Sequence, residues 1–281
     1  MITVVRAGPL TTVQDLGRPG YAHLGVPRSG ALDRPAARRA NALAGNDAAA
    51  AVLETTLMGC ALRFGAPARV AVTGATAGLT LDGARVDGPV VDVPAGAVLD
   101  VARATSGVRS YVAVAGGIAV EPVLGSRSAD TLSGLGPPRL TDGMNLPLGP
   151  GAVGSGTDGS EAAGAPPVFA GEIRLGVRFG PRDDWFAEPT ALFRDAYTVS
   201  PLSNRVGARL AGPALARGRA GELPSEGVVL GAVQVPADGR PLVFLADHPT
   251  TGGYPVIGVV DDVTPLAQAR PGTTVRFHEL D

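Results

Sequence analysis

The sequence lacks lysine altogether, because all 24 of its basic residues are arginines. This excludes a lysine Schiff base, a P-loop lysine and a biotin group attached to this chain. Cys60 is the only cysteine, which excludes an intrachain disulfide and a cysteine-rich metal site. The three histidines are too few to favour a three-histidine zinc site, so we expect no bound metal.

The sequence also lacks an excess of one charge and any long apolar run. Its 26 acidic residues nearly balance the arginines, and the formal net charge is −2. A nucleic-acid-binding protein would normally show a basic excess or stripe. No stretch reaches the roughly 20 apolar residues that a membrane helix needs, and residues 1–6 lack the features of a signal peptide. We therefore expect a cytoplasmic protein with no nucleic-acid and no membrane partner.

Glycine and proline are abundant, with 40 and 25 residues, and short valine-rich runs lie between them. Runs such as 69–73 and 109–114, separated by turn residues, predict a mainly β fold with few short helices. Asp82-Gly83 lies between two short apolar segments and predicts a two-residue hairpin turn. The clearest helix is expected to begin after the N-cap residue Asp33 and to end at Gly45.

Two more helices are expected, one capped by Thr264 and one over residues 183–193, broken near Pro189. Residues 148–167 are mostly Gly, Ala, Ser, Pro and acidic residues, with almost nothing to bury, which is typical of a linker. The sequence therefore predicts three parts: an N-terminal β-rich unit (1–148), a linker (149–167) and a C-terminal β-rich unit (168–281).

Two clusters of polar side chains and glycines are candidates for a binding site, one within residues 11–33 and one within residues 224–255. In each cluster, side chains that can hold an amide or a carboxylate lie among glycines whose main-chain N–H groups a ligand can approach. The alternative is that these glycines only form tight turns. For residues 250–254 the two interpretations are equally favoured.

A third cluster, residues 203–210, contains Arg205 and Arg209, whose guanidinium groups suit bidentate contacts with carboxylate or phosphate. A surface or structural ion pair is the commoner fate of arginine. His248 follows Asp247, but neighbouring side chains of an extended segment point to opposite faces and need not touch. Cys60 lies in an apolar run and is better explained as a small buried residue than as a nucleophile.

Together these segments resemble a known protein family. The matching motifs, in chain order, are QDLGR (14–18), GVP with SGALD (25–33), ANAL with GN (40–46), LETTL (53–57), GGI (116–118), LGSRS (124–128), SNRVGARL (203–210), SEGV (225–228), GAVQVP (231–236) and TTGGYP (250–255). On these motifs, which cover nearly the whole chain, the sequence resembles the family called allophanate hydrolase subunit 2. That family is also known as the Kip antagonist family and as the C-type subunit of the bacterial 5-oxoprolinase. Residues 133–140 and His248-Pro249 depart from the family pattern, so no role is assigned to Arg139 or Pro249.

The resemblance implies two β-barrel-like units, at least one of them cyclophilin-like, which we place at residues 168–281. It implies a partner of the allophanate hydrolase subunit 1 type (the B-type subunit of 5-oxoprolinase) and usually a third protein of the lactam-utilisation type (the A-type subunit). Such an assembly opens 5-oxo-L-proline to L-glutamate at the expense of ATP. The sequence has no P-loop, so we expect ATP to bind mainly to a partner and the isolated chain to be inactive.

A protein that shares this chemistry needs anion donors, an orienting carboxylate and shelter from water. We predict that Asp247, Glu226 or Asp15 acts as the general base. The predicted substrate-binding residues are the main chain at Gly252 and Gly253 for an oxyanion or phosphate, Arg205 or Arg209 for a carboxylate, Gln14 and Gln234 for an amide or ureido group, and Arg18, Ser203, Ser225, Thr250, Thr251 and Tyr254 beside them.

Two other functions remain open at this point. The same architecture occurs as the carboxyltransferase part of urea carboxylase, in which biotin is bound to a separate carrier. The absence of lysine agrees with such a division of labour, because any biotin would have to arrive on another protein. The second alternative is a regulatory protein that binds its subunit 1-like partner and has no catalytic part.

Overall fold

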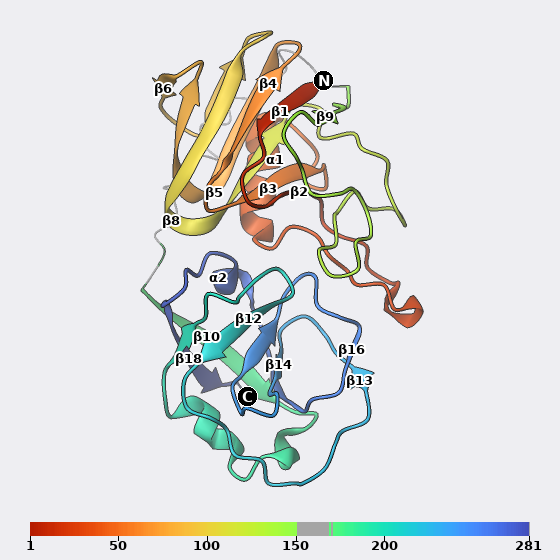
Figure 1. Cartoon of the computed structure of the whole chain (residues 1–281), viewed down its shortest axis with the longest axis vertical. Helices are drawn as coiled ribbons and strands as arrows, with labels where there is room; N and C mark the ends of the chain where they lie inside the picture. Colours follow the sequence, from red (N-terminus) through yellow and green to blue (C-terminus); the bar gives the residue numbers. More distant parts are fainter. Residues whose placement is uncertain (151–168, 170, 281) are drawn as a thin grey trace. The chain divides into compact units, whose positions relative to one another are not determined.

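The computed structural model describes residues 1–150, 169 and 171–280 (Figure 1). Its contacts divide the chain into two compact units. Unit 1 contains Met1–Arg18, Ser29–Asp130 and the described residues of Gly134–Phe169; unit 2 contains Pro19–Arg28, Thr131–Ser133 and the described residues of Ala170–Asp281. Two short segments from the predicted N-terminal part thus group with unit 2. All but the first two residues of the predicted linker 149–167 lie outside the described residues.

Unit 1 is built on a nine-stranded antiparallel sheet in the described part of the chain. Strand β8 is its centre, because it pairs with β3 and β4 along one side and with β5 along the other. The strands are β1 (Ile2–Arg6), β2 (Thr11–Gln14), β3 (Val52–Thr56), β4 (Cys60–Phe64), β5 (Ala68–Leu81), β6 (Ala84–Val86), β7 (Val90–Val93), β8 (Val98–Val114) and β9 (Asn145–Leu146).

The two longest strands, β5 and β8, bend where their pairing is irregular. The register between them shifts near Gly74 and Thr76, and Gly74 has a φ of +86° that most side chains disfavour. Beyond this bend β5 continues to Leu81 and turns at Asp82-Gly83 into β6. Both turn residues have positive φ (48° and 83°), which a type I′ turn requires, so the predicted hairpin is confirmed.

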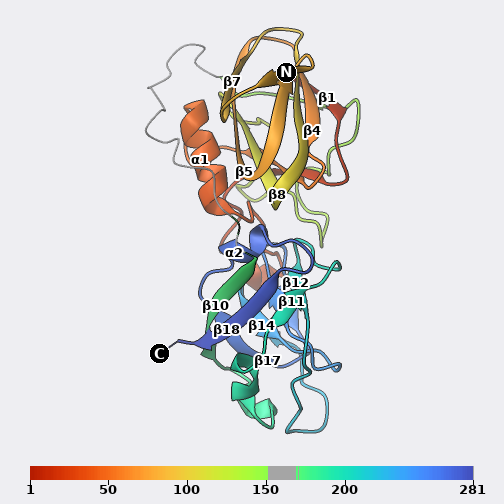
Figure 2. The ribbon, with the colours of Figure 1, turned by 90° about the vertical axis from the view of Figure 1, so that its left-hand side faces the viewer.

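Helix α1 (Arg34–Ala44) lies beside β5 (Figure 2) and closes a second apolar layer of unit 1. The Asp33 carboxylate accepts a hydrogen bond from the Ala36 N–H at 3.0 Å, and Gly45 ends the helix at a φ of +78°, so both predicted ends are confirmed. The principal core of unit 1 is a separate cluster of buried Val, Leu, Ile and Phe side chains that includes the fully buried Leu62 and Leu99.

Unit 2 contains a closed seven-stranded barrel in the order β10-β17-β14-β15-β12-β11-β18. The parallel pair β10–β18 joins the first and last of these strands. A separate two-stranded ribbon pairs β13 with β16. The strands are β10 (Glu172–Phe179), β11 (Tyr197–Val199), β12 (Gly207–Ala211), β13 (Glu226–Gly227), β14 (Ala232–Gln234), β15 (Leu242–Phe244), β16 (Thr251–Gly252), β17 (Val256–Val260) and β18 (Thr274–Glu279). The expected mainly β fold is confirmed.

The helices of unit 2 are shorter than the sequence predicts. Residues 183–193 form two short 3-10 helices, η2 (Asp183–Trp185) and η3 (Pro189–Phe193), in place of one broken α-helix. The predicted interruption near Pro189 is confirmed, because proline cannot continue a helix and begins the second one, while both pieces are 3-10 helices and not α-helical. Helix α2 (Thr264–Ala267) contains Thr264 as its first residue, and Val263 occupies the N-cap position. None of the described helices is both long and apolar enough to cross a membrane.

Candidate functional site

Four of the predicted site residues meet at the β13–β16 ribbon of unit 2. Glu226 of β13 pairs with Gly252 of β16, and Gln234 at the end of β14 reaches the same ribbon. The Gln234 Nε2 donates a hydrogen bond to the Tyr254 carbonyl oxygen at 3.1 Å. A Cβ atom at Gly252 would lie only 2.5 Å from that Nε2. Because residue 252 is a glycine, the Gln234 amide can lie close to the main chain there. We call Glu226, Gln234, Gly252 and Tyr254 together the ribbon site.

Glu226 is held at the ribbon site by Arg182, which the sequence analysis did not single out. The Arg182 Nε lies 3.0 Å from the Glu226 Oε2, and its Nη2 contacts Oε1, so the pair is bidentate. The Arg182 guanidinium lowers the pKa of the Glu226 carboxyl, and the same pairing raises the pKa of Arg182. Glu226 is thus a carboxylate at neutral pH and a weak base, suited to orienting a partner more than to removing a proton.

Arg217 is a second arginine near the ribbon site, because it binds the main chain of Val235, the residue that follows Gln234; it was not predicted from the sequence. Its side chain is half-buried, and its Nη2 donates a hydrogen bond to the Val235 carbonyl at 3.0 Å. The Nε is buried and has no hydrogen-bond partner among the described residues. An unsatisfied buried donor costs about 1–3 kcal/mol. Among 24 arginines, nothing in the sequence distinguishes Arg182 or Arg217 in advance.

A small apolar cluster lies next to the ribbon site, since its residue Val228 has its Cγ1 3.5 Å from where a Cβ at Gly252 would be. It consists of Val228, Ala232, Phe244 and Val256. The His248 ring packs against Phe244 with centroids 5.9 Å apart, and its Nδ1 lies 2.6 Å from the Pro249 carbonyl oxygen.

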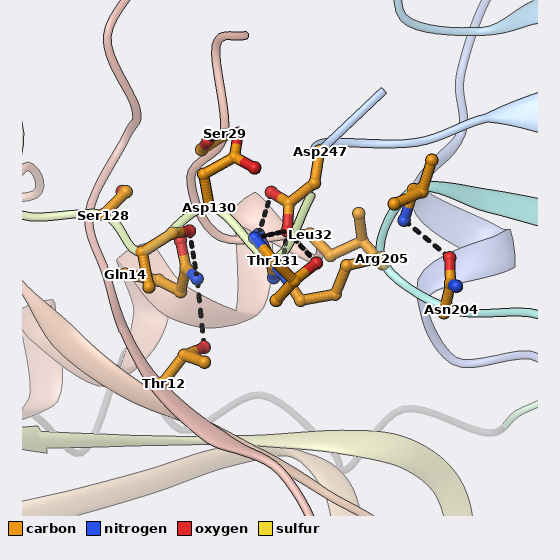
Figure 3. Close-up of polar contacts among 12 residues, drawn as sticks. Thr12, Gln14, Ser29, Leu32, Ser128, Asp130, Thr131, Asn204, Arg205 and Asp247 are labelled. Atoms are coloured by element: carbon orange, nitrogen blue, oxygen red, sulfur yellow. Dashed lines mark hydrogen bonds and ion pairs between the residues drawn. The ribbon is translucent and has the colours of Figure 1, made fainter. Parts of the chain in front are cut away.

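Asp247, which is drawn with its partners in Figure 3, lies in unit 2 and is completely buried. Arg205, itself 1% exposed, donates from Nε to Asp247 Oδ2 and from Nη2 to Oδ1, each at 2.9 Å. Thr131 donates to Oδ2 from its hydroxyl at 2.6 Å and from its main-chain N–H at 3.0 Å. Arg205 therefore binds an internal carboxylate, and a substrate carboxylate would have to displace it. These contacts favour a role for both residues in holding the surrounding chain in place. The predicted roles of Asp247 as a general base and of Arg205 in binding a substrate carboxylate stay predictions.

The rest of the 203–210 cluster forms a tight connection into β12. The Ser203 hydroxyl accepts from the Arg209 N–H at 3.1 Å and lies 3.3 Å from the Arg209 carbonyl. The Asn204 side chain accepts from the Val206 N–H at 2.8 Å (Figure 3). Arg209 is exposed. Ser203 thus holds main chain, and its predicted contact with substrate stays a prediction.

In unit 1, Asp15 is the acceptor at the centre of a hydrogen-bond network. Its Oδ1 accepts from the Ser126 and Ser128 hydroxyls at 2.6 Å each and from the Gly17 N–H at 2.7 Å. Its Oδ2 accepts from the Arg127 N–H at 2.6 Å. Four donors leave the carboxylate little capacity for a substrate, so this geometry favours a structural role. The predicted role of Asp15 as a base stays a prediction.

Gln14 and Arg18 are almost completely buried in unit 1. The Gln14 Nε2 donates to the Thr12 hydroxyl and to the Ala129 carbonyl, both at 3.0 Å, while its Oε1 has no partner among the described residues (Figure 3). Arg18 donates to the Ser29 hydroxyl at 3.2 Å, and that hydroxyl donates to Asp130 Oδ2 at 2.8 Å. The sequence analysis did not single out Ser29 or Asp130 individually, although Ser29 lies within a motif that it quoted.

Glu54 is a further buried carboxylate that the sequence analysis did not assign. Its Oε2 accepts from the Tyr111 hydroxyl at 2.9 Å and from the Leu32 N–H at 3.0 Å, and Arg109 lies 3.4 Å from Oε1. Burial and the neighbouring Glu54 charge raise the pKa of Tyr111 well above its usual value. The Tyr111 hydroxyl also accepts from the Asp33 N–H at 2.7 Å. This cluster anchors the segment that leads into α1.

The remaining predicted residues lie at or near the ribbon. Ser225, Thr251, Gly253 and Tyr254 are exposed, and the Thr250 carbonyl accepts a hydrogen bond from the Val228 N–H at 3.0 Å.

Cys60 is fully buried in unit 1, and desolvation raises the pKa of its thiol to about 12, which confirms its interpretation as a small core residue. Within the described ranges, no group of three or more His, Cys, Asp and Glu side chains is placed to hold a metal ion.

Comparisons with known proteins give one family model and relatives with two kinds of name. A family model described as carboxyltransferase domain, subdomain A and B, matches residues 24–279. The C-type subunit of the 5-oxoprolinase of Escherichia coli (strain K12) is 42% identical over 285 residues, covering 99% of this chain and 90% of that protein. The urea amidolyase of Saccharomyces cerevisiae is 33% identical, over 99% of this chain and 16% of that protein. The crystal structure of the Kluyveromyces lactis urea carboxylase matches with a TM-score of 0.86 at 30% identity, covering 100% of this chain and 27% of that one.

Proposed function

We propose, from the premise that this chain belongs to the family of carboxyltransferase domains with subdomains A and B, that it is the C-type subunit of an ATP-dependent 5-oxoprolinase. The assembly opens 5-oxo-L-proline to L-glutamate. The observation that carries the proposal is the likeness to the C-type subunit of a 5-oxoprolinase along 99% of the chain. The ribbon site supports it, because an amide, an ion pair and exposed glycine main chain lie together there.

The chemistry requires an activated amide. A lactam is resonance-stabilised and a poor electrophile. Transfer of the ATP γ-phosphoryl group to the lactam oxygen, with release of ADP, makes the carbonyl carbon reactive. Water then adds to that carbon, and the ring C–N bond breaks with protonation of nitrogen, which leaves an acyl phosphate on the opened chain. A second water molecule hydrolyses the acyl phosphate to the carboxylate of L-glutamate and inorganic phosphate. In this proposal the main-chain N–H of the exposed Gly253 donates to the anionic oxygens, and Gln234, which lies beside it at the ribbon site, orients the amide.

In this proposal the composition of the chain decides which tasks fall to its partner proteins. ATP binds mainly to a partner, because the sequence has no P-loop lysine. The partners are a B-type protein, which is subunit 1-like, and an A-type protein of the lactam-utilisation kind, and both work with this chain in the cytoplasm. The isolated chain is inactive, and no metal is required of it.

The proposal is tested by reconstitution. The chain is co-expressed with its A-type and B-type partners, and glutamate release from 5-oxoproline is measured with and without ATP. We expect ATP-dependent release by the assembly and none by the chain alone. Release by the chain alone, or no release by any reconstituted combination, would overturn the proposal.

Glu226→Gln tests the ribbon site within that assay. The substitution keeps the shape of the side chain and removes the charge that pairs with Arg182. We expect turnover to fall at least about tenfold. Glu172→Gln is the matched control, because Glu172 pairs with Arg174 at 3.2 Å and with Arg276 at 3.3 Å on β10 and β18, outside the ribbon site. Equal turnover in the two variants would remove Glu226 from the mechanism.

A second candidate function is the carboxyltransferase part of a biotin-dependent urea or amide carboxylase. It is favoured by the match to urea carboxylase along the whole chain. Biotin would be carried by a separate protein, because this chain has no lysine to hold it. Reconstitution with a biotinylated carrier and a biotin carboxylase, followed by bicarbonate-dependent carboxylation of urea, distinguishes this function from lactam opening.

A further inference from the structure

We propose that Arg217 forms a carboxylate-binding subsite at the ribbon site, and that the substrate is therefore a small amide that also carries a carboxylate. This inference rests on the proposed function and deepens it. A lactam with a ring carboxylate satisfies this description, whereas urea has no carboxylate. The subsite would thus distinguish between the two substrate classes found among the relatives.

Arg217 is held in a fixed position by its main chain and by its side chain. The main chain on either side is held, because the Leu215 N–H donates to the Gly239 carbonyl at 2.9 Å and the Gly218 N–H donates to the Trp185 carbonyl at 2.8 Å. The side chain is held as well, through its Nη2 bond to the Val235 carbonyl. A guanidinium held in this way loses less freedom when it binds an anion than a mobile surface arginine does.

The positive charge of Arg217 is not balanced by a carboxylate among the described residues. The two other arginines of the adjoining segments each have a carboxylate: Arg182 pairs with Glu226, and Arg219 pairs with Asp184. Arg217 has no carboxylate partner among the described residues, and its one side-chain hydrogen bond there is the Nη2 bond to Val235. Exposed arginines are solvated by water and need no partner, but Arg217 is half-buried with a buried, unsatisfied Nε. A bound carboxylate would supply the negative charge that Arg217 lacks, at the exposed end of its guanidinium.

Arg217 is tied to the same stretch of chain as the amide of Gln234. Its partner Val235 follows Gln234 directly, and the Val235 N–H donates to the Pro255 carbonyl at 3.0 Å. The Gln234 amide binds the carbonyl of Tyr254, the residue before Pro255. The guanidinium and the amide are therefore fixed to adjacent residues of the same strand pair. One small molecule can engage both only if its carboxylate and its amide are close together, as they are on a five-membered lactam ring.

The binding test uses the full chain alone. The Nε–H resonance of Arg217 is assigned by comparison with Arg217→Gln and followed by ¹⁵N NMR during titration with acetate or 5-oxoproline, with chloride at matched ionic strength as the control. We expect both carboxylates, but not chloride, to shift it. The absence of a shift would overturn the subsite regardless of whether any assembly is active. A shift produced by the B-type partner protein, with loss of the acetate response, would show that a partner side chain fills the position, which also overturns the proposal.

The kinetic test uses the reconstituted assembly and two lactams, 5-oxoproline and the carboxylate-free 2-pyrrolidinone. Removal of a hydrogen-bonded charge pair weakens binding about 10-fold to 100-fold. We expect Arg217→Gln to raise the KM for 5-oxoproline by that factor with little change in kcat, and to leave the KM for 2-pyrrolidinone unchanged. Arg217→Lys should recover part of the loss.

The control is Arg240→Gln. The Arg240 side chain is exposed, and its ion pair with Asp238, at 4.0 Å, is long and lies in a surface turn. An equal loss with both lactams in Arg217→Gln would assign the residue a structural role and overturn the inference. If the assembly opens neither lactam, the proposed function fails, and the NMR titration still decides whether Arg217 binds carboxylates.

Discussion

The wholly or partly buried carboxylates of this protein accept hydrogen bonds from donors in distant parts of the sequence. Asp15 receives hydrogen bonds from residues more than a hundred positions away, and Asp247 and Glu54 are similarly enclosed. Such groups stabilise the fold only while their partners remain, since an unpaired buried charge is costly. The sequence identifies them as acidic residues in suggestive motifs, but it cannot show which of them are already saturated.

Asp15→Asn is expected to destabilise unit 1 by about 3 kcal/mol, because an amide nitrogen would face donors that now meet a carboxylate oxygen. Hydrogen exchange at residues 126–128 should increase, and urea denaturation should give the change in unfolding free energy. Asp92→Asn, an exposed change on β7, serves as the control. Comparable stability of the two variants would show that the network around Asp15 contributes little.

Tyr197→Phe is expected to stabilise unit 2 by about 1 kcal/mol at neutral pH, because the buried Tyr197 hydroxyl has no hydrogen-bond partner among the described residues. The effect should grow in alkali. Burial, with a smaller contribution from Asp195, raises the pKa of Tyr197 from 10.0 to about 12. Between those pH values the unfolded chain loses the proton and the folded chain keeps it, so stability falls as the pH rises through this range. Phenylalanine removes that loss.

The measurement is the urea midpoint at about pH 8 and about pH 11, with Tyr21→Phe as the matched control in the same unit. A smaller decline between the two pH values in Tyr197→Phe than in the control is expected. An identical decline would assign the alkaline loss to other groups.

Secondary-structure elements were predictable where local chemistry decides them. Helix α1 has its N-cap at Asp33 and its end at Gly45, and the Asp82-Gly83 hairpin has the positive φ values that its residues favour. The bend of β5 at Gly74 and the closure of the barrel depend on pairing between strands far apart in sequence, which no local signal reveals. The same limit applies to the site: Gln234 and Gly252 were predicted, but Arg182 and Arg217 were not.

Gly252→Ala tests the β13–β16 ribbon as an element. The new Cβ would displace the Gln234 amide, which lies 2.5 Å from its position, and break the bond to the Tyr254 carbonyl. We expect a loss of about 1 kcal/mol, the typical value of one hydrogen bond, together with reduced turnover of the assembly. In a Gln234→Ala background the added methyl group should cost little stability. An unchanged penalty in that background would show that the glycine serves another purpose.

At the scale of the whole molecule, each unit carries its own spectroscopic or chemical reporter. Trp185, the only tryptophan, belongs to unit 2, and Cys60, the only cysteine, is buried in unit 1. Because the pKa of the Cys60 thiol is raised to about 12, the folded protein should resist thiol reagents at about pH 8. Labelling therefore reports unfolding of unit 1, and fluorescence reports unfolding of unit 2.

We expect Asp15→Asn to lower the urea midpoint of Cys60 labelling more than that of Trp185 fluorescence. Tyr197→Phe should raise the fluorescence midpoint more than the labelling midpoint. The reason is that the clusters of buried apolar residues lie within one unit or the other. Equal shifts of both reporters in each variant would instead show that the two units unfold as one cooperative system.

The parallel pairing of β10 with β18 has a consequence for biosynthesis. Since β18 is the last barrel strand in chain order, a ribosome must complete residues 274–279 before the barrel can close. Until then the nascent segment exposes unpaired edges on both β10 and β11, the two neighbours of β18. Unit 2 therefore acquires its closed form only after translation has passed these residues, and a stalled or shortened product would offer both edges to chaperones or to other chains.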